Sequence, residues 1–216
     1  MNQSMSQIIR ARSEALLAQF HTSPAPPKMA LGGLDIRQNM TLLWTGAWEV
    51  DQPDQSFFWI HPTDATQSSV WAKPGYGPYR DAYKRFITRA YGIAHPAIPG
   101  GFDVDHLQAK ETTPAGAVIR LEAVARGSNR SHGGGVEKRM GNSTVTAGRR
   151  ATNHTPGSMT WLVAMKLAGV LSPTVATSAS SEARRQAAIS FFVSKGWNRG
   201  IVEQGMEDLV NVINRR

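Results

Sequence analysis

Two short segments of this chain hold side chains that can do chemistry together. Asp105 is followed directly by His106 in the segment Gly101–Leu107, and Asn129 lies in the later segment Gly127–His132. Carboxylate and amide oxygens suit a hard divalent metal ion, and a neutral imidazole can take a proton from water near neutral pH. Because a metal ion beside a general base can cleave phosphodiester bonds, the pattern indicates that reaction.

The elements that would position these groups follow from the surrounding residues. The apolar run that closes at His106 and the run 117–124 predict two strands, and the basic segment after them predicts a helix. Adjacent strand residues point to opposite faces. We therefore expect Asp105 and His106 to converge because the strand ends there and enters a loop. Glycines at 133–135 would weaken the helix by about 1 kcal/mol each, so we expect it to be short.

This arrangement resembles the HNH nuclease family, also called ββα-metal or His-Me finger, in its cysteine-free form. The resemblance covers residues 101–140 and rests on the strand ending at His106, its hairpin partner and the helical segment around Asn129. It implies that His106 is the general base, Asp105 the first metal ligand and Asn129 the second. It also implies a divalent metal cofactor, Mg²⁺ first, with Mn²⁺, Ni²⁺ or Zn²⁺ as alternatives.

Further residues would support such a site. Asp103 lies two residues before Asp105, on the same strand face, and would act as a carboxylate behind the metal ligand. His132, one helical turn beyond the amide ligand, would bind the metal or a phosphate. The family commonly has an asparagine on the second strand, where this chain offers Arg120 and Glu122 as the polar candidates. Either Glu122 or backbone carbonyls fill that role, or the site is degenerate.

Net charge indicates a polyanionic partner. The chain of 216 residues has a formal charge of +8 and a pI near 10.2, which favours nucleic acid. The residues expected to contact it are Arg120, Arg126, Arg130, Lys138 and Arg139. Because no recognition module accompanies them, we expect affinity from phosphate contacts, strong salt dependence and low sequence specificity. DNA is favoured over RNA as the partner.

Hydrophobic periodicity divides the chain into three parts within an α+β fold. Residues 1–30 read as a helical arm and a proline-rich linker, which would pack on the body, self-associate or dock elsewhere. Residues 31–150 would form the nuclease core, with the ββα-metal centre, an antiparallel hairpin within 40–62 and a basic helix over 78–91. Residues 151–216 read as C-terminal helices packed on that core.

Composition excludes other classes of site. The absence of cysteine rules out disulfides and thiolate zinc sites. No apolar run reaches transmembrane length and no signal-peptide pattern begins the chain, so no membrane role is predicted. We expect a cytoplasmic protein, or one exported without a cleaved signal peptide that acts in the cytoplasm of a target cell.

The leading expectation is a metal-dependent endonuclease that hydrolyses DNA. An antibacterial toxin with an acidic inhibitor, or immunity, protein as partner, or a mobile-element or defence nuclease, would fit it. One alternative is a non-catalytic nucleic-acid-binding protein on a degenerate nuclease scaffold. Another is an interaction protein whose basic face docks an acidic protein. RNA as the substrate is a third, because a metal ion and an imidazole serve either polymer.

Overall fold

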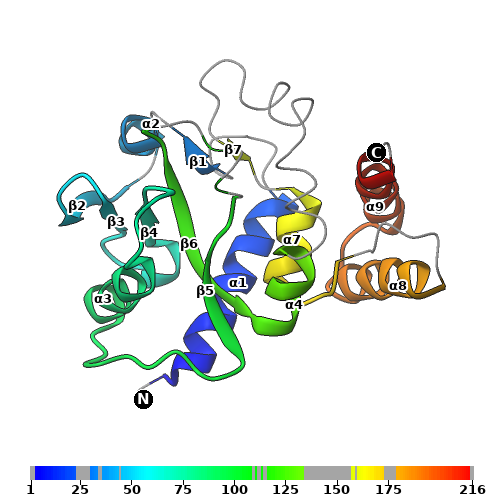
Figure 1. Cartoon of the computed structure of the whole chain (residues 1–216), viewed down its shortest axis with the longest axis horizontal. Coiled ribbons are helices and arrows are strands. Elements are labelled where there is room, and N and C mark those ends of the chain that lie inside the picture. Colours follow the sequence, from blue (N-terminus) through cyan, green and yellow to red (C-terminus); the bar gives the residue numbers. More distant parts are fainter. Residues whose placement is uncertain are drawn as a thin grey trace.

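A curled antiparallel sheet with helices around it forms the body of the protein, in a computed structural model (Figure 1). The predicted α+β class is therefore confirmed. The structure describes residues 3–22, 30–33, 36–43, 45–108, 110, 113, 116–133, 157–158, 160–172 and 179–214.

The described strands are β1 (Ala30–Gly33), β2 (Ala47–Gln52), β3 (Ser56–Ile60), β4 (Ser69–Ala72), β5 (Phe102–His106), β6 (Val118–Ala125) and β7 (Gly157–Ser158). The described helices are α1 (Met5–Thr22), α2 (Ile36–Leu43), α3 (Tyr79–Tyr91), α4 (Arg126–Ser131), α7 (Trp161–Leu167), α8 (Ala179–Ser194) and α9 (Arg199–Asn214), with a 3₁₀ turn at Ala65–Gln67.

Strand β6 is the centre of the sheet. The order is β2-β3-β4-β6-β1-β7, and β5 also pairs with β6, all antiparallel. Almost every residue of β6 is buried, as expected for a strand covered on both faces. The hairpin expected within 40–62 is β2–β3, joined by a turn in which Asp54 has a φ of 55°.

Several short elements were not anticipated, among them α2, β1 and β4. Residues 40–43 belong to α2 rather than to the hairpin, and β1 and β4 lie outside the predicted strands. Each strand is four residues long, too short for an alternating pattern to stand out in the sequence. The helix expected over 78–91 is confirmed as α3, and it ends where Gly92 takes a φ of 69°.

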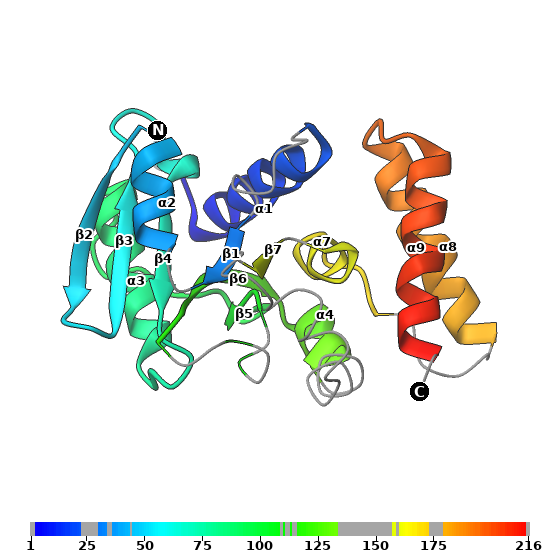
Figure 2. The ribbon, with the colours of Figure 1, turned by 90° about the horizontal axis from the view of Figure 1, so that it is seen from above.

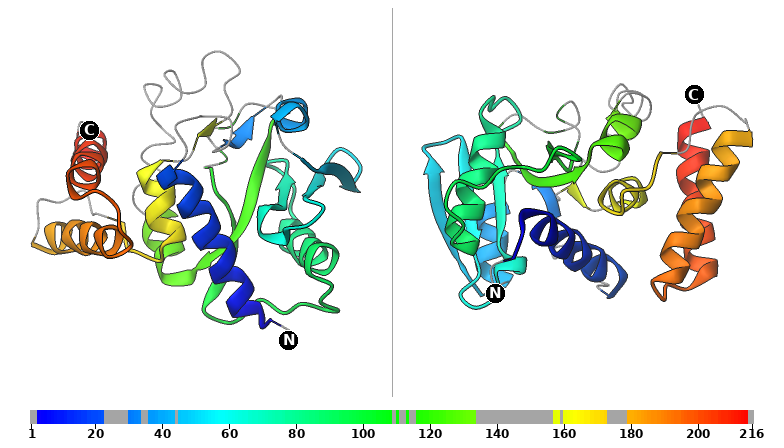
Figure 3. Two further views of the ribbon diagram at one scale, coloured as in Figure 1. Left: turned by 180° about the vertical axis from the view of Figure 1, so that it is seen from behind. Right: turned by 90° about the horizontal axis from the view of Figure 1, so that it is seen from below.

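Helix α1 packs into the core and is not a detached arm. Ile8, Ile9, Leu16 and Leu17 are buried against the sheet and against α7. Each such side chain contributes about 1.5–3 kcal/mol when fully buried. Of the three alternatives for the N-terminal segment, packing on the body is the one observed. Figure 3 shows α1 crossing the back of the sheet.

The expected C-terminal helices are confirmed as α7, α8 and α9. Figure 2 shows α8 and α9 side by side at one end of the molecule, beyond α7. Gly205 on α9 faces the indole of Trp161 so closely that a Cβ there would overlap it. Among the helices of the described residues, none has both the length and the hydrophobicity of a membrane span.

Candidate functional site

The predicted order of strand, strand and helix is present. Strands β5 and β6 pair in register from Phe102 opposite Ala125 to His106 opposite Leu121. Helix α4 begins at the residue after β6, where the Arg126 amide donates to the Gly101 carbonyl at 2.9 Å. The hairpin and the helix are therefore a single continuous unit, with the helix at the end of the hairpin farther from His106.

Asp105 and His106 leave β5 in opposite directions. The His106 ring lies 4.7 Å from the ring of Tyr79 on α3, whereas the Asp105 carboxylate accepts a hydrogen bond from Lys166 on α7. The expected convergence is therefore wrong. The reason is that regular pairing continues through His106, and the next amide, of Leu107, still donates to the Arg120 carbonyl. Alternation along a regular strand then separates the two side chains.

His106 is a buried, neutral imidazole. Its residue is 3% exposed, and neither ring nitrogen has a hydrogen-bond partner of normal geometry among the described residues. The pKa of the imidazole is lowered to about 4, mainly by burial and then by the Lys110 charge, which together outweigh the opposing Asp105 charge and a backbone contact with Lys73. At neutral pH the ring is therefore unprotonated, which is the state that a general base requires.

Asp105 is held by a buried cation. The Lys166 side chain has no exposed surface, and its ammonium donates to a carboxylate whose side chain is 24% exposed. Because an unpaired buried ammonium is costly, this partner fixes the position of Asp105. Sequence reasoning missed Lys166. The available signal was a lone cation within the apolar run of α7.

Helix α4 contacts the same side of β5 as Asp103. The Arg126 guanidinium forms an ion pair with the Asp103 carboxylate at 3.2 Å, with both side chains partly exposed. Ser128 is buried and donates to the Val170 carbonyl at 2.9 Å, which anchors the helix on the segment after α7. Asn129, the next residue, is partly exposed. The predicted carboxylates and amide are thus on neighbouring elements.

His132 lies in the interior. It is fully buried, and its Nε2 donates to the Val170 carbonyl at 3.0 Å. The lone pair of the neutral ring is then on Nδ1, which is buried and has no hydrogen-bond partner among the described residues. Only Nδ1 could bind the predicted metal ion or phosphate, and its burial does not favour that role.

Arg120 and Glu122 are interior residues. The Glu122 carboxylate accepts hydrogen bonds from Arg12 at 2.5 and 2.9 Å and from Arg120 at 3.0 and 3.1 Å. All three side chains are at most 5% exposed. The surface position expected for Arg120 is therefore wrong. Glu122 lies opposite Asp105 in the ladder, but its oxygens bind the two guanidiniums.

The exposed cations near His106 come from α3 and from the loop after β5. On α3, Lys84, Arg85 and Arg89 form ion pairs with carboxylates. Arg80 lies 5.2 Å from the Tyr79 ring centroid, and the Lys110 ammonium lies 5.1 Å from it. Neither has a carboxylate partner among the described residues.

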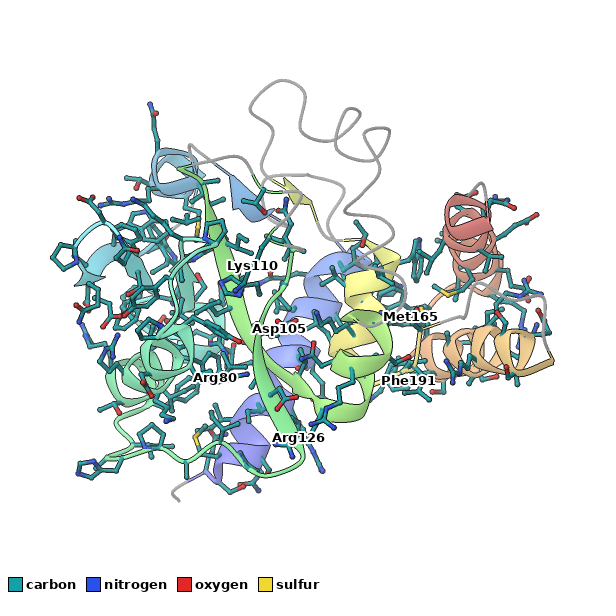
Figure 4. All side chains as sticks on the ribbon, viewed as in Figure 1. Arg80, Asp105, Lys110, Arg126, Met165 and Phe191 are labelled. Carbon is teal, nitrogen blue, oxygen red and sulfur yellow. The ribbon has the colours of Figure 1, made fainter. Side chains whose placement is uncertain are left out.

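Figure 4 places Lys110, Asp105 and Arg126 in succession along the β5–β6 hairpin, with Arg80 on the α3 side. Arg130 is exposed on α4. The predicted contacts Lys138 and Arg139 lie outside the described residues. Lys110, Arg80 and Arg126 therefore flank the hairpin that carries His106 (Figure 4).

The oxygen ligands near Asp105 are of the kind that a hard metal ion prefers, but the Asp105 carboxylate is already bonded to Lys166. Asp105 and Asn129 offer the carboxylate and amide oxygens that Mg²⁺ prefers. Within the described ranges, no group of three or more His, Cys, Asp or Glu side chains is arranged to hold a metal ion. An ion at Asp105 would have to share this carboxylate with the Lys166 ammonium.

Comparison of this chain with protein-family models, with curated proteins and with solved structures gives no match.

The buried histidines predict acid sensitivity. The pKa of His132 is lowered to about 4, mainly by burial, which outweighs the opposing Val170 hydrogen bond, with a smaller contribution from the Lys166 charge. An unfolded histidine titrates near pH 6.5, so protons bind the unfolded chain first. The stability is therefore complete above that pH and falls as the pH drops toward 4, by about 1.4 kcal/mol per pH unit for each such histidine.

Urea unfolding between pH 7 and 5 measures this slope. His132→Asn is expected to flatten it, whereas His95→Asn is the matched control, because His95 is exposed and its positive φ suits asparagine. A wild-type stability that stays constant over this range would contradict the burial of neutral imidazoles.

Proposed function

We propose that this protein is a divalent-metal-dependent endonuclease that hydrolyses phosphodiester bonds of DNA with low sequence specificity. The observation that carries the proposal is His106, a buried imidazole with a lowered pKa whose ring nitrogens have no hydrogen-bond partner of normal geometry among the described residues, close to the Lys110 charge. Perturbed titratable groups of this kind concentrate at functional sites. The net charge of +8 supports a polyanionic substrate.

In this mechanism, His106 accepts the proton from the attacking water, since the imidazole is unprotonated at neutral pH. Arg80 and Lys110 offset the charge of the phosphate next to it. Asp105 and Asn129 would hold the metal ion, with Asp103 behind them. The ion, when bound, would stabilise negative charge on the phosphate and the leaving oxygen. A secreted toxin restrained by an acidic inhibitor, or a defence nuclease, would use such an activity.

Lys166 sets a condition on metal binding. Its ammonium donates to the Asp105 carboxylate, so a divalent ion must compete with it for the carboxylate. The opposite directions of Asp105 and His106 set a second condition, because the phosphate must reach around the end of β5 to meet both.

Nicking of a supercoiled plasmid tests the proposal. Wild-type protein is expected to produce relaxed and linear forms with Mg²⁺ or Mn²⁺ and to lose this activity in excess chelator. A structured RNA, incubated in parallel, establishes whether the protein cleaves RNA instead of DNA. Wild-type protein that cleaves neither polymer with any of Mg²⁺, Mn²⁺, Ni²⁺ or Zn²⁺ contradicts the enzyme proposal.

A second candidate function is non-catalytic binding of nucleic acid. The observation that favours it is the divergence of Asp105 and His106, together with the occupation of the carboxylate by Lys166. This candidate predicts salt-dependent DNA binding by wild-type protein without cleavage. Binding and nicking measured on the same preparation therefore separate the two functions.

A further inference from the structure

We propose that the N-terminus of α3, with Tyr79, Arg80, Lys110 and His106, is a binding site for one phosphodiester group of nucleic acid. This proposal rests on the proposed function, to which it adds the subsite that holds the phosphate beside His106. It places the first substrate contact on α3 and on the loop after β5, not on α4.

Two exposed cations contact the same aromatic ring at this site. The Arg80 guanidinium and the Lys110 ammonium lie 5.2 and 5.1 Å from the centroid of the Tyr79 ring. Neither side chain has a carboxylate partner among the described residues. Each cation–π contact positions one charge at the ring, so both charges would attract an anion bound beside it.

The helix adds its own positive end. Helix α3 has 13 residues, starts at Tyr79 and has no side-chain hydrogen bond at its cap residue, Pro78. The Asp81 and Ala82 amides donate to the Pro78 carbonyl, so the amides of Tyr79 and Arg80 carry the partial positive charge of this helix end. The one carboxylate in that turn, Asp81, is paired with Lys84 at 3.0 Å, which offsets its repulsion of an anion.

His106 supplies an independent sign of a ligand. Its ring lies 4.7 Å from the Tyr79 ring, the residue is only 3% exposed, and neither ring nitrogen has a hydrogen-bond partner of normal geometry among the described residues. Buried polar groups in proteins are nearly always satisfied. Because both ring nitrogens are buried, a phosphate oxygen would have to approach from the Tyr79 side to accept the hydrogen bond of the imidazole N–H.

Salt-dependent DNA binding tests the site without any cleavage. A fluorescein-labelled DNA duplex is titrated with protein in excess chelator over a series of salt concentrations, and anisotropy gives the affinity. The variant Arg80→Gln/Lys110→Gln is expected to bind more weakly. Its slope of log affinity against log salt is expected to fall by about 0.9 for each phosphate that the variant no longer neutralises. The matched control is Arg10→Gln/Lys195→Gln, which removes two exposed charges, one on α1 and one just after α8, where Lys195 lies 3.7 Å from Glu14.

A spectroscopic measurement tests His106 separately. Dimethyl phosphate, added to wild-type protein with ¹⁵N-labelled histidine, is expected to shift the His106 ring nitrogens in the NMR spectrum. The same addition to Arg80→Gln/Lys110→Gln is expected to leave them unchanged. Equal reductions of affinity in the two double variants, or His106 resonances that ignore dimethyl phosphate in wild-type protein, overturn the proposal.

The outcomes keep this inference apart from the proposed function. If wild-type protein does not cleave, and the salt slope falls in Arg80→Gln/Lys110→Gln but not in the control variant, the phosphate site is supported and the enzyme proposal is contradicted. Cleavage by wild-type protein, together with equal salt slopes for wild type and Arg80→Gln/Lys110→Gln, supports the enzyme and contradicts the phosphate site.

Discussion

Replacement of His106 by alanine is expected to lower the rate of plasmid nicking by about a hundred- to ten-thousand-fold, the range that one general base contributes. The physical reason is that the neutral imidazole at the end of β5 is removed, and no other histidine ring contacts Tyr79 in the described residues. Initial rates at saturating Mg²⁺, with circular dichroism as a check on folding, measure the effect.

Two comparisons make this result specific. His95→Asn, which changes an exposed histidine, is expected to cleave at the wild-type rate. Added imidazole is expected to restore part of the activity of His106→Ala, which a merely structural role of the ring would not produce. His106→Ala protein that nicks as fast as wild type removes His106 from the mechanism.

Glu122→Gln is expected to destabilise the folded protein by about 3–5 kcal/mol, the usual result of removing one partner from a buried ion pair. Burial alone would raise the pKa of this carboxyl, but the charges of Arg12 and Arg120 lower it overall. The carboxylate is therefore ionised in the interior, and its removal leaves two guanidiniums buried without an anion. The midpoint of urea unfolding at pH 7 measures the change.

Glu203→Gln is the matched control. Glu203 pairs with Arg199 at 3.1 Å on the surface of α9, with both side chains largely exposed. Exposed pairs of this kind contribute about 0–1 kcal/mol, so little change is expected. Similar unfolding midpoints for the two variants would show that the Arg12–Glu122–Arg120 group does not hold α1 on the sheet.

The strands and helices nearest the candidate site followed from local pattern. The apolar run ending at His106 and the next one predicted β5 and β6, and the spacing of Tyr79, Tyr83, Phe86 and Ile87 predicted α3. Hydrophobic periodicity and turn residues predict these elements because both depend only on neighbouring residues in the chain. Strand β4 was missed since four residues contain too little periodicity.

Partners of the charged side chains did not follow from pattern. Arg120 resembles a surface cation in the sequence, but it is buried with Glu122 and Arg12, a residue 110 positions away from Glu122. Lys166 and Asp105 are likewise 61 positions apart. Such pairs form only when distant elements pack, so residue type alone cannot distinguish a phosphate contact from an interior ion pair.

The sequence by itself determined that the chain is basic, free of cysteine and built of mixed strands and helices, with an Asp-His pair at a strand end. These properties are composition and short-range periodicity, which need no knowledge of packing. Only the tertiary structure decided which way each side chain of that pair points. Pairing of β5 with β6 through His106 turned the imidazole toward α3 and the carboxylate toward α7, because regular strand pairing alternates neighbouring side chains between faces.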